Sequence, residues 1–234
     1  MNPRLNALLE HLPVPEYELF LPHLELISMV RGDVLFDAEQ TLDFVYFPVG
    51  AVISIICEVD GGHSIEINMV GSTSMVGLTN IGTPSFYKAE VRASGFAYRM
   101  SFSTYQRLHQ SCPVFMKLHA AAQLGSLRYI SLTSACGKHH TIEQQLVRWL
   151  LFNLDRTFTP QIIVTHQEVS RLLGFRREAI TLTLGKLVHS GSIKLGRGEI
   201  MVTDRQLLEQ LSCECYWRIQ GKSRPTFTSL LKKH

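Results

Sequence analysis

Residues 31–102 carry short apolar and alternating runs separated by turn residues. Phe44–Phe47 and Ala51–Val59 are rich in β-branched and aromatic side chains, and Ser64–Val70 alternates. Asp60-Gly61-Gly62, between the last two runs, predicts a hairpin turn. Further strands are expected at Val34–Phe36, Ala89–Ala93 and Phe96–Phe102. Strands this short and this closely spaced are typical of an all-β sandwich or barrel.

The residues before this region follow a helical period instead. Apolar residues from Leu5 to Leu12 recur at helical spacing, and Pro13 breaks the pattern. A second short helix is expected over Tyr17–Leu26. Two short helical segments should therefore precede the strands.

A long helix is predicted from Pro113 to Gly137, where glycine is expected to end it. Its apolar stripe consists of Phe115, Leu118, Ala122, Gly125, Tyr129, Leu132 and Cys136. This three–four alternation is the pattern of a seam between helices. The stripe can cover the strands of its own chain, or it can meet the same helix of a second copy, because the small Ala122 and Gly125 permit close approach.

The C-terminal part predicts a helix, a short strand and then two helices joined by a turn. Thr141–Gln144 can cap a helix that runs to about Arg156, and Gln161–Val164 reads as a strand. Thr165 and Glu168 form a capping box at the start of the next helix, which Gly174 ends. In the last helix, which begins near Arg176, the buried side is formed by Ile180, Leu184 and Leu187.

The start of this last helix carries side chains that can read DNA bases. Arg176, Arg177, Glu178, Thr181 and Leu182 lie off its buried side. Arg pairs with guanine, Glu accepts from cytosine, and Thr or Leu can contact a thymine methyl group. In a helix-turn-helix the second helix enters the major groove by its N-terminal end. The alternative is an ordinary helix pair with a solvated charged face.

The first helix and the following hairpin would contact the DNA backbone. Thr165, His166 and Gln167 begin the helix that crosses the backbone in such a motif. Residues 191–202 alternate around a Gly-Arg-Gly turn, which predicts a hairpin and hence a winged helix. Arg197 at the hairpin tip is placed for a phosphate, although a solvated turn residue is the plainer interpretation.

Charge is distributed unevenly along the chain. The net charge of +3 divides into −4 for residues 1–137, with 8 basic and 12 acidic residues, and +7 for residues 138–234, with 15 and 8. The basic half holds the predicted helix-turn-helix, which favours a polyanionic partner. There is no apolar run long enough to span a membrane and no signal-peptide pattern, so a cytoplasmic location is expected. Walker, G-x-S-x-G and H-E-x-x-H motifs are lacking, so the chain is not expected to be an enzyme.

The five cysteines form no recognisable disulfide framework. Cys213-Glu-Cys215 is too short for a typical zinc knuckle, and no metal site is predicted. Cys136, His139 and His140 nevertheless come close together in sequence. They leave an alternative open, in which the chain is a redox- or metal-responsive protein that binds an ion there.

The order of these elements resembles the Crp/Fnr family of bacterial transcription regulators over about residues 15–215. The likeness is carried by Gln167-Glu168, Leu173-Gly174, Arg177-Glu178 and the Gly-Arg-Gly wing. It implies an α+β fold with an N-terminal β-roll, that is, a double-stranded, jelly-roll-like β-helix. By this resemblance residues 15–112 form the sensor roll, 113–137 the dimerisation helix, 138–215 the winged helix-turn-helix domain and 216–234 a loosely ordered tail.

The family's ligand does not carry over with the fold. Members that bind cyclic AMP hold its phosphate with a Glu and an Arg, and the matching positions here are Gly77 and Tyr87. Lys88 next to Tyr87, and Ser131 on the long helix, are the remaining effector-binding candidates. No cofactor is predicted, because an iron–sulfur cluster would need cysteines near the N-terminus and none precedes Cys57.

The sequence as a whole predicts a homodimeric regulator that binds a palindromic operator in double-stranded DNA. Dimerisation through the long helix is favoured because two readers related by a two-fold axis match palindromic DNA. RNA polymerase is a further candidate partner, and no membrane is expected. Leu182 replaces a residue that is often a polar or basic reader in the family, so the operator should differ from the best-known one. A roll that serves only as a dimer scaffold is the third possibility.

Overall fold

The computed structural model describes residues 1–78 and 83–222 of the 234-residue chain. In these residues, seven N-terminal strands form two antiparallel sheets, with the orders β1-β7-β3 and β2-β6-β4-β5. The strands are β1 (Glu25–Met29), β2 (Val34–Phe36), β3 (Phe44–Pro48), β4 (Val52–Val59), β5 (His63–Val70), β6 (Lys88–Ala93) and β7 (Gly95–Ser101). They pack over a shared apolar interior, which confirms the α+β fold with a jelly-roll-like N-terminal roll.

The hairpin between β4 and β5 closes where the turn was expected. Gly61 and Gly62 both have a positive φ there, 85° and 77°. One strand differs from expectation, because β1 lies where the sequence suggested the end of a helix. Glu25–Met29 pairs antiparallel with β7 along its whole length, and that long-range pairing overrides the local helical pattern.

The N-terminal segment is fixed to the roll rather than standing apart from it. It contains η1 (Pro3–Leu5), α1 (Ala7–Glu10), α2 (Val14–Phe20) and η2 (Leu21–His23). Leu8, Leu9 and Leu12 are buried in the same apolar cluster as Phe47. The fully buried Asn6 amide donates to the carbonyl oxygens of Pro48 at 2.9 Å and Ser74 at 2.8 Å. This segment therefore completes the core of the N-terminal half.

Two helices follow the roll, α3 (Phe102–Ser111) and the long α4 (Pro113–His139). At 27 residues α4 is about 40 Å long. The Glu16 carboxylate of α2 accepts hydrogen bonds from the backbone N–H groups of Val114 at 2.9 Å and Phe115 at 2.8 Å, which caps its first turn. The helix passes through Gly137, which was expected to end it, and His140 is its C-cap.

The apolar stripe of α4 faces its own chain, so its assignment to a helix–helix seam between two copies was wrong. Phe115, Tyr129 and Cys136 are buried, and Leu118 and Ala122 pack against the core of the roll. Core packing and a coiled-coil seam give the same period, and only the position of the roll decides between them. The opposite side of α4 is the one left exposed.

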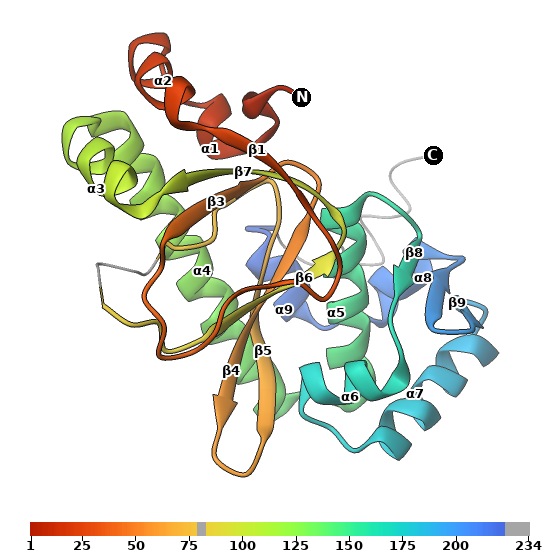
Figure 1. Ribbon diagram of the computed structural model, residues 1–234. Helices are drawn as coiled ribbons and strands as arrows, with labels where there is room; N and C mark the ends of the chain where they lie inside the picture. The colour runs from red at the N-terminus through yellow and green to blue at the C-terminus, as the bar shows by residue number, and fades with distance from the viewer. Residues whose placement is uncertain (79–82, 223–234) are drawn as a thin grey trace, which may run out of the picture.

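Helix α5 (Ile142–Thr157) lies at the centre of the molecule. Its ten residues from Gln145 to Leu154 are all buried. The cluster around them combines Val52 and Met69 of the roll with Val169 and Ile180 of the C-terminal helices. Figure 1 shows α5 between the strands of the roll and the α6–α7 pair. The two halves of the chain therefore share one apolar core.

The remaining elements form the winged helix-turn-helix. They are β8 (Gln161–Ile163), α6 (His166–Leu173), α7 (Arg177–His189), β9 (Ile193–Gly196), β10 (Glu199–Val202), α8 (Arg205–Leu211) and α9 (Glu214–Ile219). The three strands form a small antiparallel sheet in the order β8-β10-β9. Helix α5 begins with the expected Thr141–Gln144 capping box and ends at Thr157, next to the expected Arg156, with Phe158 as its C-cap in the left-handed region.

The chain beyond residue 215 was expected to be loosely ordered, and for the part that the structure describes this is wrong. Tyr216 and Trp217 of α9 are buried in the central cluster. The Tyr216 hydroxyl donates to Asp155 of α5 at 3.0 Å, and the Trp217 indole donates to Ser212 at 3.1 Å. The rest of the expected tail, residues 223–234, lies outside the described residues.

Two glycines provide a matched test of this packing. Gly77 has a φ of +102°, and an added Cβ would lie 2.9 Å from Val45 Cγ1, so Gly77→Ala should lower the free energy of unfolding by about 1–3 kcal/mol. Gly185 lies exposed in α7 with nothing within 4 Å of an added Cβ, so Gly185→Ala should raise the free energy of unfolding by about 0.5–1 kcal/mol. Urea denaturation of both variants, with unchanged m-values, tests whether the two stability changes have opposite signs. Equal stability of Gly77→Ala and the unaltered protein would contradict this account of the roll.

Candidate nucleic-acid interface

The turn between α6 and α7 is built from local signals that can be followed in the sequence. The Thr165 hydroxyl accepts from the Glu168 N–H at 3.2 Å, and the Glu168 carboxylate accepts from the Thr165 N–H at 2.8 Å. This reciprocal capping box fixes the start of α6. At the other end Gly174 adopts a φ of 71°, in the left-handed region that glycine enters most easily. The chain can therefore turn sharply into α7.

Helix α7 presents its first turns to solvent. Its buried side is formed by Ile180, Leu184 and Leu187, as the spacing predicts. The candidate base readers on the other sides are all exposed: Arg176, Arg177, Glu178, Thr181 and Leu182. Leu182 is 71% exposed, so this apolar side chain contributes little to the core of its own chain. An exposed leucine among charged groups is consistent with contact to a base methyl group.

The start of α6 lies against the same part of α7. The His166 ring nitrogen Nδ1 is 3.1 Å from the Thr181 hydroxyl oxygen, so the two helices are linked at the proposed reading end. Gln167 and Thr165 are exposed beside it. The nine candidate positions from the sequence therefore fall on α6, α7 and the wing, with Arg197 exposed at the β9–β10 turn. Lys186 on α7 and Lys194 on β9 are exposed basic residues that the sequence reasoning did not single out.

Helix α6 is docked on the roll through ion pairs. The Glu168 carboxylate pairs with Arg31 and lies 3.6 Å from the Arg92 guanidinium. Arg171 of α6 pairs with Glu90 of β6 at 3.3 Å. Burial opposes the charge on Glu168, but hydrogen bonds from Thr165 and the charges of Arg31 and Arg92 hold its pKa below the ordinary value. The position of α6 is thus tied to the roll.

A second polar group lies deeper at the same junction. Glu66 of β5 is buried, and it accepts from the Ser54 hydroxyl and from the Trp149 indole of α5 at 3.0 Å. Burial raises the pKa of this carboxyl, although its hydrogen bonds and the Arg92 charge oppose the shift. Arg92 in turn donates to the Ile163 carbonyl oxygen of β8 at 2.9 Å. These bonds give the junction between roll and winged helix a defined geometry.

Comparison with known proteins agrees with this arrangement. Residues 144–211 match the family described as the Crp-like helix-turn-helix domain. The regulator CLP of Xanthomonas campestris, described as c-di-GMP-responsive, is 19% identical with a TM-score of 0.67 over 81% of this chain and 99% of its own. A crp/fnr-family structure from Eubacterium rectale is 16% identical with a TM-score of 0.69 over 88% and 98%. An HTH-type transcriptional regulator of Porphyra purpurea, ycf28, is 22% identical over 80% of this chain and 81% of its length.

Residues 144–211 thus match a Crp-like helix-turn-helix domain, and the chain as a whole shares its fold with solved Crp/Fnr-family structures. No helix among residues 1–78 and 83–222 is long and apolar enough to cross a membrane.

The four effector-binding candidates lie in the roll and on α4. Gly77 lies against Val45, and Tyr87 is buried with its ring 5.7 Å from that of Phe36. Lys88 pairs with Asp37 at 3.2 Å. Ser131 is exposed on α4. None of these four residues lines the pockets found around residues 1–78 and 83–222.

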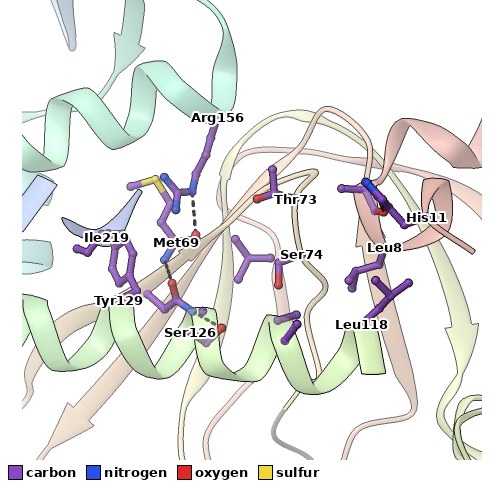
Figure 2. Close-up of a pocket in the computed structure, with 16 residues that line it drawn as sticks. Leu8, His11, Met69, Thr73, Ser74, Leu118, Ser126, Tyr129, Arg156 and Ile219 are labelled. Carbon is purple, nitrogen blue, oxygen red and sulfur yellow. Dashed lines mark hydrogen bonds between the residues drawn. The ribbon is translucent and has the colours of Figure 1, made fainter. Parts of the chain in front are cut away.

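A pocket of about 410 Å³ opens elsewhere, between α4, the N-terminal helix α1 and the end of β5 (Figure 2). Sequence reasoning did not find it, because its lining comes from five separate stretches of chain. Arg156 of α5 donates to the Met69 carbonyl oxygen at 2.8 Å, and the Asn68 amide donates to the Ser126 hydroxyl at 3.2 Å. These bonds join the roll to α4 and α5, so the polar groups of the pocket have a structural role.

The structure brings together a different set of cysteines and histidines than the Cys136/His139/His140 alternative supposed. His139 is exposed, whereas Cys136 and His140 lie beside Cys213 and Cys215. The Cys213-Glu-Cys215 pair, judged too short for a zinc knuckle, is thus one half of a four-residue cluster. The sequence could not show this, because 77 positions separate Cys136 from Cys213.

The docking of α6 can be tested through the charge of Glu168. Glu168→Gln keeps a capping-box residue but removes the ion pairs with Arg31 and Arg92, so it should lower the free energy of unfolding by about 1 kcal/mol at pH 7. Because folding lowers the pKa of the Glu168 carboxyl, its ionised form stabilises the protein at a pH above the pKa of the unfolded state. This stabilisation is lost as the pH falls through the pKa of the folded state. The difference between variant and unaltered protein should therefore shrink below about pH 4.3 in urea titrations.

Glu178→Gln is the matched control for that experiment. Glu178 is exposed in the first turn of α7, so its replacement should change stability by only a few tenths of a kcal/mol at either pH. If both variants lose equal stability, Glu168 does not hold α6 on the roll.

Proposed function

We propose that this Crp/Fnr-type protein is a homodimeric transcription regulator that binds a two-fold symmetric operator through α7. The observation that carries the proposal is the exposure of Arg177 and Glu178 at the N-terminal end of a helix whose other side is buried. A helix placed in this way can enter the major groove and present hydrogen-bonding groups to base edges. The wing residue Arg197 and the exposed lysines 186 and 194 supply charge for phosphates.

The proposed dimer forms through the exposed side of α4. Its largest exposed apolar side chains are Met116, Leu124 and Leu127, with Leu124 67% and Leu127 60% exposed. Ala120 and Ser131 continue the same face at spacings of four. A stripe of this kind on a helix of about 40 Å is costly to leave in water and matches itself across a two-fold axis.

The proposed effector control acts through the junction between the roll and α6. A ligand that binds one arrangement of the roll better than another would shift the position of α6, because Glu168 and Arg171 hold that helix to the roll. The effector itself stays a prediction, and so does contact with RNA polymerase. The relative from Xanthomonas campestris is described as responsive to c-di-GMP, a property of that protein.

Arg177→Ala should weaken binding to a duplex selected by the unaltered protein from a random library. Loss of a bidentate contact to guanine is expected to cost about 1–3 kcal/mol, or roughly 5- to 150-fold in Kd, and to relax the preference at one position. Fluorescence anisotropy at fixed salt measures this. Arg107→Ala, an exposed arginine on α3, is the control and should bind as the unaltered protein does. Equal Kd values for the Arg177 variant and the unaltered chain would refute the reading role of α7.

A double change in α4, Leu124→Glu with Leu127→Glu, should convert the dimer into a monomer. Two carboxylates on the apolar stripe would meet their own copies across the two-fold axis. Light scattering after gel filtration should show half the mass of the unaltered protein, with unchanged circular dichroism. Leu19→Glu, which places a charge on an exposed leucine of α2, should leave the mass unchanged. A dimer that survives the double change does not form through this stripe.

A further inference from the structure

Three cysteines and a histidine gather where the long helix ends. Cys136 lies in the last turn of α4 and His140 is the C-cap residue of that helix, while Cys213 and Cys215 flank the start of α9. The Cys136 and Cys213 sulfur atoms are 3.6 Å apart, and the Cys215 sulfur is 3.6 Å from His140 Nδ1. The four potential ligand atoms all lie within 4.8 Å of one another.

This spacing is that of ligands around one tetrahedral ion. A zinc–sulfur bond of about 2.3 Å places two thiolate ligands about 3.8 Å apart at the corners of a tetrahedron. Three Cys and one His are a donor set of structural zinc sites, which have all four positions filled by protein. A site for Mg²⁺ or Ca²⁺ would need oxygen ligands instead.

The cluster is closed to solvent. The three cysteines are at most 3% exposed. Four protein ligands held together away from water are the arrangement of a structural zinc site, which leaves no coordination position open.

His140 is also oriented as a ligand would be. Its Nδ1 points to Cys215, and its Nε2 lies 3.3 Å from a Glu214 carboxylate oxygen. Its backbone carbonyl oxygen accepts from the Gln145 amide at 2.9 Å. A histidine that binds a metal through one nitrogen commonly donates its other N–H to a carboxylate, which fixes the ring.

We infer that Cys136, His140, Cys213 and Cys215 bind one Zn²⁺ ion that joins the end of α4 to α9. Binding releases the thiol protons of the cysteine ligands to solvent and changes no oxidation state. Because His140 is followed directly by the Thr141 cap of α5, the ion lies at the joint between the proposed dimerisation helix and the DNA-binding domain. It fixes the angle at that joint.

Metal analysis of the full chain tests the site without reference to DNA. Protein purified without a histidine tag, under reducing conditions, should contain about one zinc per chain. After removal of zinc, titration with Co²⁺ alone should give sulfur-to-cobalt charge-transfer absorption and the intense visible bands of a tetrahedral ion, saturating at about one equivalent. Cobalt bands without the sulfur signature, or no uptake of either metal, would overturn the inference.

Variants then assign the ligands. Cys213→Ser should abolish the charge-transfer bands or weaken Co²⁺ binding by more than tenfold, and Glu214→Gln, which keeps all four ligands, should weaken it by about 10- to 100-fold. Cys57→Ser and His139→Ala are the matched controls and should bind as the unaltered chain does. If Cys213→Ser fails to fold, Glu214→Gln and the cobalt spectrum of the unaltered chain still decide the question.

One competing chemistry has a separate signature. If mass spectrometry of protein alkylated without prior reduction shows a Cys136–Cys213 disulfide, and protein purified under reducing conditions holds no metal, the pair forms a redox bond and the zinc site is refuted. Failure of DNA binding with zinc retained would instead count against the proposed regulator alone.

Discussion

Burial of helix α5 on all sides is the constraint on which the rest of the structure depends. Ten consecutive residues of this helix are buried, so it cannot be the surface helix of an independent domain. The strands of the roll, the paired helices α6 and α7, and the C-terminal helix α9 each cover part of it. The roll and the winged helix-turn-helix are therefore packed against one helix and share its apolar surface.

Polar contacts decide how the two halves are aligned on this common core. Apolar packing around α5 is not directional, whereas the Trp149 bond to Glu66 and the Arg92 bond to the Ile163 carbonyl oxygen each require one geometry. The more exposed pairs, Glu168 with Arg31 and Arg171 with Glu90, lie at the edge of the same junction. Such edge pairs contribute little energy and can be exchanged at little cost. The junction therefore has a fixed centre and a weaker rim.

Helix α4 connects these features to assembly. One side of the helix closes the core of the roll, its far end lies in the cysteine–histidine cluster, and its outer side carries the exposed leucines. Because one continuous helix of 27 residues carries all three features, their relative positions are fixed by its length and period. The C-terminal helix α9 packs against both α4 and α5, so the last described residues complete the joint rather than trailing from it.

The sequence by itself determined the elements whose signals are short-range. The Thr165–Glu168 capping box, the Gly174 turn, the wing hairpin and the buried side of α7 need only neighbouring residues, and they lie where the pattern placed them. Tertiary structure decided the rest. Periodicity shows that a helix face is buried but not what covers it, so the stripe of α4 was assigned to a second copy although it faces the roll. Likewise Glu25–Met29 became a strand only by pairing with β7, and Cys136 met Cys213 only because the chain folds back around α5. Each of these outcomes depends on contacts between residues far apart in the chain, which no local pattern contains.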